Sequence, residues 1–225
     1  MTSIDFDQYA RDYASLIAEQ TEAFDSDNDY FVRYKVDRLQ SIAPHARSIL
    51  DFGCGVGRSI PFLRAAYPQA EIIGSDPSAE SLAFARKTNP KETFVPLNEL
   101  GAETRYDVIF AACVFHHIAP EIRDETLAFC RERLAPGGRI VIFEHNPLNP
   151  VTQRLVNTCP FDADAVLLGK GETAARLKRA GLEIDKSGYC LFFPGALGFL
   201  RPLEKHLRWL PLGGQYFVSA ARKQS

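Results

Sequence analysis

Between residues 47 and 146, short apolar runs alternate with amphipathic segments, and this alternation limits the possible folds more than any other feature. Five runs have the composition of buried strands, namely RSILDFG, AEIIGSD, ETFVPL, YDVIFAACVF and GRIVIFEHN. Three segments between them look helical, namely GRSIPFLRAAYP, PSAESLAFARKT and PEIRDETLAFCRERLAPGG, the last stopped by Pro136-Gly137-Gly138. Strands that alternate with helices form βαβ units, so we expect a doubly wound α/β fold with a mostly parallel sheet.

The segments on either side complete a single predicted domain, residues 1–225. Residues 1–46 predict a helical N-terminal cap, in which YFVRYKVDRLQSI follows a break at 25–28. The first helix of this cap carries an apolar-aromatic stripe: Phe6, Tyr9, Tyr13, Leu16, Ile17, Gln20 and Phe24. Residues 47–146 form the predicted cofactor-binding core, and residues 147–225 form a C-terminal part.

The C-terminal part is less regular. NPLNPVTQRLVNTCPFDAD reads as a loop, KGETAARLKRAGLE as a helix, and 182–193 and 215–223 as strands. The insertion at 194–212 carries a helical apolar face made of Phe199, Leu200, Leu203, Leu207 and Leu210. Two readings stay open for this insertion: a cap helix packed on the domain, or a lid that contacts the substrate or a lipid-like acceptor.

Composition narrows the classes of partner. The net charge of -2 does not favour binding to nucleic acid or to an anionic membrane. We find neither a secretory signal at the start nor an apolar run of the roughly 20 residues that span a bilayer. The five cysteines are scattered and include no CxxC pair, so we predict reduced thiols in a cytoplasmic protein. The oligomeric state cannot be read from the sequence.

A glycine-rich stretch, SILDFGCGVGRS, follows the first predicted strand. Gly53, Gly55 and Gly57 would form the turn into a helix that starts near Gly57, at the strand end where α/β sheets bind ligands. Asp76 closes the next strand and is placed to accept the hydroxyls of a ribose. The alternative role of Asp76 is a helix N-cap before Pro77, with Pro77 at the first helical position.

Two ligand classes share this arrangement, dinucleotides and S-adenosylmethionine. A dinucleotide site requires a third glycine where this chain has Arg58. Asp51, two residues before the first glycine, would also repel a diphosphate, whereas it suits a ligand with a cationic amino acid end. The residues therefore favour S-adenosylmethionine over a nicotinamide cofactor.

Four consecutive motifs resemble those of class I S-adenosylmethionine-dependent methyltransferases: ILDFGCGVGRS, IIGSDPSAESLAFAR, YDVIFAACVFHHI and LAPGGRIVIFEHN. The resemblance implies seven strands with the last antiparallel, and S-adenosyl-L-methionine as the cofactor. It implies that Asp51 and the Gly53–Gly57 turn, Cys54 included, hold the methionine part. The implied contacts elsewhere are Asp76 and Pro77 at the ribose, Asn98 or Glu99 at the adenine, and the backbone of Ala112 and Cys113. Tyr30 and Lys35 would reach the cofactor carboxylate, although a solvated surface position for Lys35 stays open.

Three histidines follow predicted strands and are candidates for catalysis. His145 is our first choice as a general base. Glu144 is a candidate to orient its imidazole, although neighbouring residues of a strand point to opposite faces. His116 is the second choice, and the alternative for His116 and His117 is hydrogen bonding within their loop. Adjacent histidines suggest a metal, but because we see no carboxylate that completes a site, we expect none.

These features predict a methyltransferase for a small-molecule acceptor. A histidine base favours O-methylation, and a glycan, a lipid-linked intermediate or a natural-product scaffold would fit. N- or C-methylation stays open, as does a protein of the same fold that binds the cofactor without methyl transfer. A nicotinamide-dependent oxidoreductase is a further alternative, which Asp51 and Arg58 disfavour.

Overall fold

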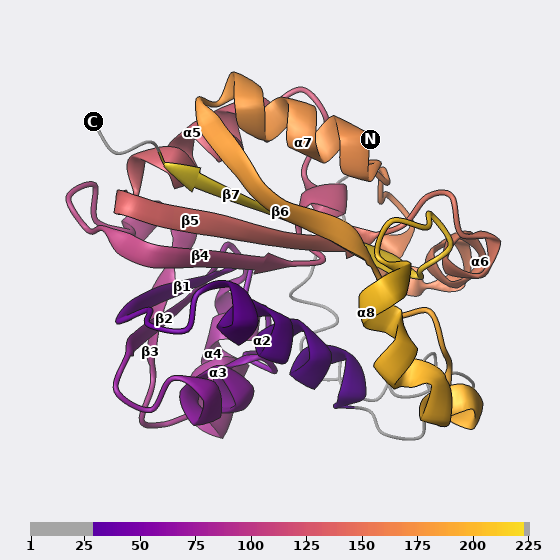
Figure 1. Cartoon of the computed structure of the whole chain (residues 1–225). Coiled ribbons are helices and arrows are strands. Elements are labelled where there is room, and N and C mark those ends of the chain that lie inside the picture. The colour runs from indigo at the N-terminus through magenta and orange to yellow at the C-terminus, as the bar shows by residue number, and fades with distance from the viewer. Residues whose placement is uncertain (1–28, 223–225) are drawn as a thin grey trace.

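A single mixed sheet lies at the centre of residues 29–222, the part of the chain that this computed structural model describes (Figure 1). Its strands are β1 (Ser48–Phe52), β2 (Glu71–Asp76), β3 (Thr93–Pro96), β4 (Tyr106–Ala112), β5 (Leu134–His145), β6 (Leu182–Cys190) and β7 (Gln215–Arg222). Their order is β3-β2-β1-β4-β5-β7-β6, with β7 antiparallel to β5 and β6 and the other pairs parallel. The predicted sheet, with its antiparallel last strand, is confirmed.

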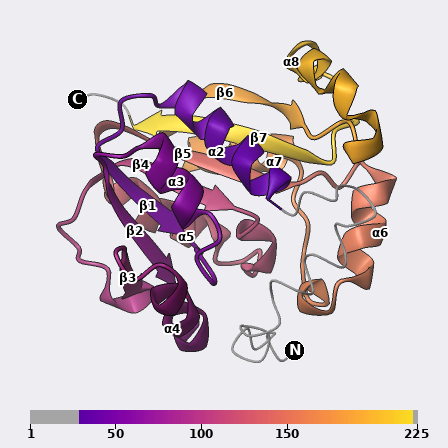
Figure 2. The ribbon, with the colours of Figure 1, turned by 90° about the horizontal axis from the view of Figure 1, so that it is seen from below.

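Helices cover both faces of this sheet, as Figures 1 and 2 show. They are α2 (Tyr30–Ile42), α3 (Ile60–Ala66), α4 (Ala79–Thr88), α5 (Arg123–Glu132), α6 (Pro150–Thr158), α7 (Lys170–Arg179) and α8 (Glu204–Leu207). Residues of α2, α3 and α4 pack on one face and residues of α5 and α7 on the other, in two separate apolar clusters. Neighbouring residues of one strand enter different clusters: Ile49 faces α2 and α3, and Leu50 faces the opposite side. This two-sided burial explains the continuous apolar runs in the sequence.

The predicted helix YFVRYKVDRLQSI has the bounds of α2, whereas the aromatic stripe between Phe6 and Phe24 lies outside the described residues. No helix within residues 29–222 is long and apolar enough to cross a membrane.

The prediction of a loop after residue 147 is wrong in part, because this segment contains α6. The side chain of Asn149 accepts hydrogen bonds from the backbone N–H groups of Val151 and Thr152, and Pro150 occupies the first turn. Both features are strong helix-start signals. The Asn149-Pro150 pair, which we interpreted as part of a loop, therefore begins a helix.

Two helix boundaries also differ from the prediction. The helix α5 ends at Glu132, and β5 begins at Leu134 and runs through Pro136, Gly137 and Gly138. A register shift against β4 between Tyr106 and Val108 accommodates this irregular start. The helix α3 begins at Ile60 rather than near Gly57, because the glycine turn extends to Ser59.

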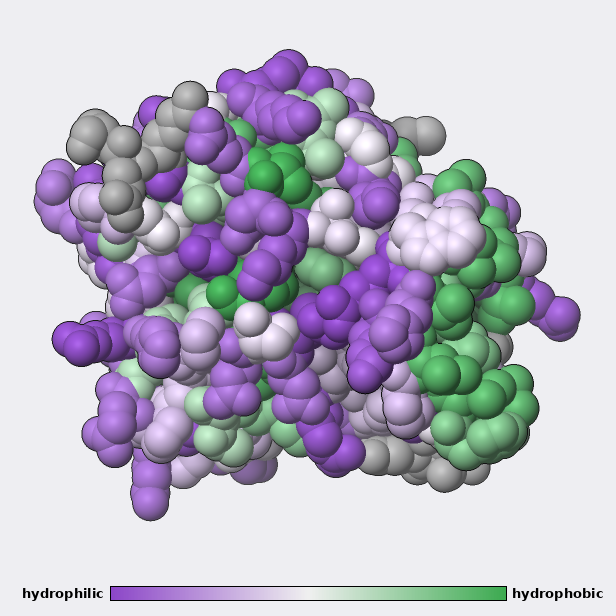
Figure 3. Space-filling view, viewed as in Figure 1, coloured by the Kyte–Doolittle hydropathy of each residue, from purple (hydrophilic) through white to green (hydrophobic). Residues whose placement is uncertain are grey.

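The insertion at 194–212 folds into a 3₁₀ segment, Gly195–Leu203, followed by the single turn of α8. Its apolar side chains gather on the surface around α8 (Figure 3), and Phe199 and Trp209 are 77% and 74% exposed. Glu204 attaches the segment to the domain: its buried carboxylate accepts hydrogen bonds from the backbone N–H groups of Leu191, Phe192 and Phe193. Further hydrogen bonds attach the end of the insertion: the carbonyl of Arg208 accepts from the N–H of Tyr189, and the carbonyl of Leu212 accepts from the side chain of Asn149.

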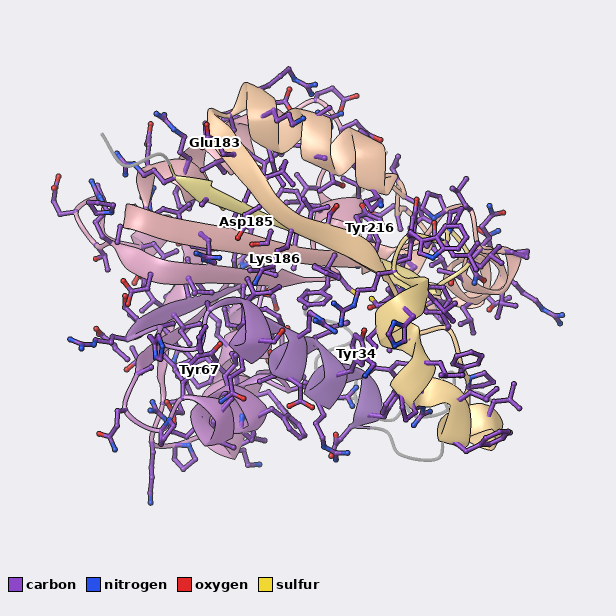
Figure 4. The ribbon with its side chains drawn as sticks, viewed as in Figure 1. Tyr34, Tyr67, Glu183, Asp185, Lys186 and Tyr216 are labelled. Atoms are coloured by element: carbon purple, nitrogen blue, oxygen red, sulfur yellow. The ribbon has the colours of Figure 1, made fainter. Side chains whose placement is uncertain are left out.

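Aromatic side chains occur on both sides of the sheet (Figure 4). Tyr34 belongs to α2, and Tyr67 caps the end of α3. Tyr216 belongs to β7, where its hydroxyl donates to the carbonyl of Leu168 at 2.9 Å and lies 2.6 Å from Thr173 Oγ1. These hydroxyl contacts connect β7 to the start of α7.

Candidate active site

The glycine turn between β1 and α3 depends on backbone conformations that favour glycine. Gly53, Gly55 and Gly57 have φ angles of 71°, 51° and 77°. A Cβ atom on Gly53 would lie 2.6 Å from a methyl of Val114, whereas a Cβ atom on Gly55 would meet nothing within 4 Å. Gly55 therefore faces open space at the carboxyl end of β1.

That open space belongs to a cavity of about 440 Å³ over the carboxyl ends of β1, β4 and β5. Its size is within the usual range for ligand sites, roughly 300–1,000 Å³. The structure brings many of the predicted site residues to its wall: Lys35, Asp51, Gly53, Cys54, Gly55, Ala112, Cys113, His116 and His145. Other predicted residues do not line it, namely Tyr30, Gly57, Asp76, Pro77 and Asn98.

Asp51 is buried at the glycine end of the cavity, with 2% of its surface exposed. Ser59 Oγ donates a hydrogen bond of 2.6 Å to its carboxylate. Burial nevertheless dominates and raises the pKa of Asp51 to about 7. The carboxylate is thus held in an unfavourable environment, which a cationic ligand group in the cavity would relieve.

We expect Asp51→Asn to stabilise the cofactor-free protein at pH 8. Because the pKa of Asp51 is about 7 in the folded protein and near 3.8 when exposed, the folded state binds more protons between these values, and stability falls as pH rises through this window. Removing the charge should raise Tm at pH 8 by about 3 °C or more, with little change near pH 4. Cofactor affinity should fall. The exposed Asp37→Asn is the control, and an equal Tm gain at both pH values would contradict the argument.

Asp76 supports the glycine turn directly. Its Oδ2 accepts a hydrogen bond of 2.8 Å from the backbone N–H of Gly55, and its Oδ1 accepts one from Ser78. The N-cap of α4 is Ser78, whose Oγ accepts from the N–H of Ser81. The alternative reading of Asp76 as the helix cap is therefore wrong, and Pro77 precedes the cap instead of occupying the first helical position.

We expect Asp76→Ala to weaken cofactor binding by roughly 10–100-fold. The variant loses the carboxylate that would accept the ribose hydroxyls, and hydrogen bonds to a charged group contribute about 1.5–3 kcal/mol. Calorimetric titration with S-adenosylhomocysteine measures the change. Asp107→Ala is the matched control, because Asp107 accepts hydrogen bonds from the backbone N–H groups of Arg47 and Ser48 at the opposite end of the sheet. Equal affinity losses in both variants would show a general loss of stability instead.

Lys35 on α2 is buried and enters the cavity wall, so the alternative of a solvated position is wrong. Its Nζ lies 3.3 Å from Cys113 Sγ and donates to it. Tyr30 does not enter the wall: the Arg201 guanidinium stacks on its ring at 3.5 Å from the centroid. The next residues of α2, Phe31 and Val32, line the cavity in its place.

Asn98 is placed away from the cavity too. It is exposed in the 3₁₀ turn Leu97–Glu99 that follows β3, and Glu99 is exposed beside it. Contact of either side chain with the adenine stays a prediction.

Cys113 contributes more than the predicted backbone contact. It has a positive φ of 60° and directs its thiol to Lys35 and to the amide of Gln215, whose Nε2 is 3.4 Å away. Burial alone would raise the pKa of this thiol, but the Lys35 ammonium and His145 outweigh burial and lower the pKa to about 6. The sequence indicated Cys113 only as a position after β4, and it gave no sign of Gln215.

Glu144 orients His116 and not His145, which corrects the prediction. One carboxylate oxygen of Glu144 accepts hydrogen bonds from the backbone N–H groups of Val114 and Phe115, at 2.9 and 2.7 Å. The other oxygen lies 2.6 Å from His116 Nδ1. Consecutive residues of β5 point to opposite faces, so the side chain of Glu144 cannot hold its neighbour.

Asp162, in the 3₁₀ turn Pro160–Asp162 after α6, brings a carboxylate to the histidine pair. Its Oδ1 lies 3.5 Å from His116 Nε2 and 3.3 Å from His117 Nε2. Our reason for expecting no metal, the lack of a carboxylate, is therefore wrong. Burial opposes protonation of His116, but Glu144 and Asp162 prevail and raise its pKa to about 10, which makes His116 a poor proton acceptor at neutral pH.

His145 ends β5 and lines the cavity beside this cluster. Its ring centroid is 5.0 Å from that of His116, and it approaches the Cys113 thiol closely enough to affect its pKa. His116 and His117 each form a salt bridge with a carboxylate. Within the described residues, His145 is the predicted catalytic histidine that lines the cavity without such a salt bridge.

A sheet of this order, with a glycine turn after β1 and a cavity over its carboxyl edge, is typical of α/β proteins that bind a nucleoside-containing cofactor. The family model "Methyltransferase domain" matches residues 50–140, which hold the turn, Asp76 and the histidine pair. The chain is therefore similar to methyltransferases over this matched part, and its fold is that of S-adenosylmethionine-dependent methyltransferases of known structure.

Individual similar proteins are named as methyltransferases too. A trans-aconitate 2-methyltransferase of Rhodopseudomonas palustris is 32% identical over 147 residues, which cover 64% of this chain and 56% of the relative. The chain thus spans about half the length of the curated relatives it matches. A TehB-like methyltransferase from Corynebacterium glutamicum has a similar structure, with a TM-score of 0.63, 20% identity and 97% of both chains covered. A Haemonchus contortus phosphoethanolamine N-methyltransferase in complex with S-adenosyl-L-methionine has a TM-score of 0.60, at 17% identity, over 85% of this chain and 53% of that one.

Proposed function

We propose that this protein transfers the methyl group of S-adenosyl-L-methionine to an oxygen atom of a small, largely apolar acceptor. The observation that carries the proposal is the composition of the cavity. Asp51 and the glycine turn lie at one end, and His116, His117 and His145 lie where β4 and β5 end. This arrangement leaves room for a cofactor over β1 and an acceptor beside it.

Apolar side chains dominate the acceptor side of the cavity. Val151 and Leu155 come from α6, and Phe192 and Phe193 follow β6. Asp162 supplies an acidic group on the same side. Such a wall favours an aromatic or aliphatic acceptor that presents one polar group to the histidines.

The charges of the cavity do not favour a tricarboxylate such as trans-aconitate, which the names of the curated relatives indicate for those proteins. Among the described residues that line it, the permanently cationic side chains are Lys35 and Arg58. Lys35 donates to Cys113, and Arg58 is 3.6 Å from Asp29. An acceptor with three carboxylates would have to be buried against apolar side chains and Asp162, without the cations that such groups require.

Methyl transfer to a hydroxyl is a displacement in which the oxygen forms a bond to the methyl carbon while the sulfonium becomes a thioether. The enzyme's main contribution is alignment, which is worth up to about 7–11 kcal/mol. We assign the hydroxyl proton to His145, because its ring lines the cavity where β5 ends.

The test is a measurement of S-adenosylhomocysteine formation with two acceptor sets, simple phenols and aliphatic alcohols in one and trans-aconitate in the other. We expect turnover with members of the first set and none above background with trans-aconitate. Efficient turnover of trans-aconitate alone would overturn the proposed acceptor class. A lack of cofactor binding in calorimetry would overturn the proposal of methyl transfer itself.

We expect Phe193→Ala to raise the acceptor KM by about 10-fold or more and to leave cofactor affinity within a few-fold, because Phe193 lines the acceptor side of the cavity. Leu203→Ala is the matched control, since Leu203 is half exposed on the neighbouring 3₁₀ segment and does not line the cavity. Steady-state kinetics at saturating cofactor measure both. The same KM in the parent and in Phe193→Ala would remove this wall from the acceptor site.

A further inference from the structure

Three side chains of the cavity place potential metal ligands close together: His116, His117 and Asp162. The Nε2 atoms of the two histidines lie 3.5 and 3.3 Å from the same carboxylate oxygen of Asp162. Ligand atoms bound ~2.0–2.2 Å from a tetrahedral zinc ion are about 3.3–3.6 Å apart. Both measured separations are therefore those expected between two ligands of one ion.

Glu144 holds His116 in the orientation that such a site needs. A metal-bound histidine commonly donates its other ring N–H to a carboxylate. Glu144 is fully buried and lies 2.6 Å from His116 Nδ1, while the backbone N–H groups of Val114 and Phe115 fix its other oxygen. With one ring proton on Nδ1, a metal ion can take the place of the second proton between His116 Nε2 and Asp162.

The two carboxylates of this cluster also favour a bound cation. Glu144 and Asp162 bring two carboxylates to the buried histidine pair, and the ion pairs that the described chain offers them come from those histidines. A dication would neutralise both carboxylates. Since the ligands come from two turns far apart in sequence, after β4 and after α6, the ion would also join the two walls of the cavity.

We propose that His116, His117 and Asp162 bind one divalent transition-metal ion, with zinc as the best match, whose open coordination position faces the cavity. Two imidazole nitrogens and one carboxylate oxygen are ligands that zinc accepts readily, whereas magnesium prefers oxygen ligands alone. Three protein ligands with a fourth position open is the arrangement of catalytic zinc sites. That position takes a water molecule or an oxygen of the acceptor. The metal site goes beyond the proposed function, because metal binding requires no methyl transfer.

The experiment is calorimetric titration of the chelator-treated full chain with Zn²⁺, and visible absorption after addition of Co²⁺. We expect one equivalent of Zn²⁺ per chain and the absorption bands of tetrahedral Co²⁺. Asp162→Asn and His117→Ala should each lower the Zn²⁺ affinity by more than the roughly 10–100-fold that loss of a ligand's hydrogen-bond partner costs. His206→Ala, at an exposed position on α8, is the matched control and should bind Zn²⁺ as the parent does.

Lack of Zn²⁺ binding would overturn the metal site and leave a proton between the carboxylates and His116. Zn²⁺ binding that survives in Asp162→Asn and His117→Ala but is lost in Cys113→Ser would also overturn it. Circular dichroism of each variant shows that the chain is folded. Titration of the same samples with S-adenosylhomocysteine separates the two proposals: cofactor binding without zinc refutes only the metal site, and zinc binding without cofactor refutes only the methyl transfer.

Discussion

Gly55→Val is expected to abolish cofactor binding while the protein stays folded. The backbone of Gly55 has a positive φ and faces the open cavity, so a side chain there projects into the space of the ligand and meets no protein atom. Strain from the left-handed conformation costs only about 1–2 kcal/mol. Calorimetry with S-adenosylhomocysteine should show a loss of at least 100-fold, with the circular dichroism spectrum retained.

Gly53→Val is the informative companion to that variant. A Cβ atom at Gly53 would lie 2.6–2.7 Å from both methyl groups of Val114, inside the packed interior. This variant should therefore lower Tm strongly, whereas Gly55→Val lowers it little. Cofactor binding by a folded Gly55→Val protein would exclude this turn from the cofactor site.

His145→Ala is expected to lower kcat by roughly 10²–10⁴-fold, the usual contribution of a general base. Cofactor affinity should stay within a few-fold, because the glycine turn and Asp51 are at the other end of the cavity. Rates are measured in single turnover with a saturating phenol acceptor. His206→Ala, at an exposed position on α8, is the matched control. Retention of most of the parent kcat in His145→Ala would give His145 a structural role and favour an acceptor that needs no base.

The periodic parts of the fold could be predicted from the sequence. The bounds of α2 follow from a single amphipathic run, and the parallel strands follow from apolar runs that the sheet buries on both faces. Asn149 and Pro150 were misread, because Asn and Pro are common to turns and helix starts. The local sequence alone does not decide between them, since packing of the following residues against the domain selects the helix.

The residues of the candidate site also fall into a group that the sequence could predict and a group that it could not. Asp51 and the glycines lie in one continuous stretch, so their spacing already showed them as a unit. Asp162 could not be found, because it reaches the histidines only through the path of the chain after α6. Strand geometry already spoke against Glu144 as the partner of His145, because consecutive residues of a strand face opposite sides. The actual partner of Glu144, His116, follows a different strand and depends on the pairing of β4 with β5.

The stacking of Arg201 on Tyr30 links two segments that are far apart in the sequence. Arg201 also donates to the carbonyl of Phe193, so it joins the start of α2 to the chain that forms the acceptor wall. A cation–π contact at such a position contributes only about 0.5–1 kcal/mol, close to the thermal energy. Separating the start of α2 from the acceptor wall at this contact therefore costs little free energy, so the two segments are joined without being fixed rigidly to each other.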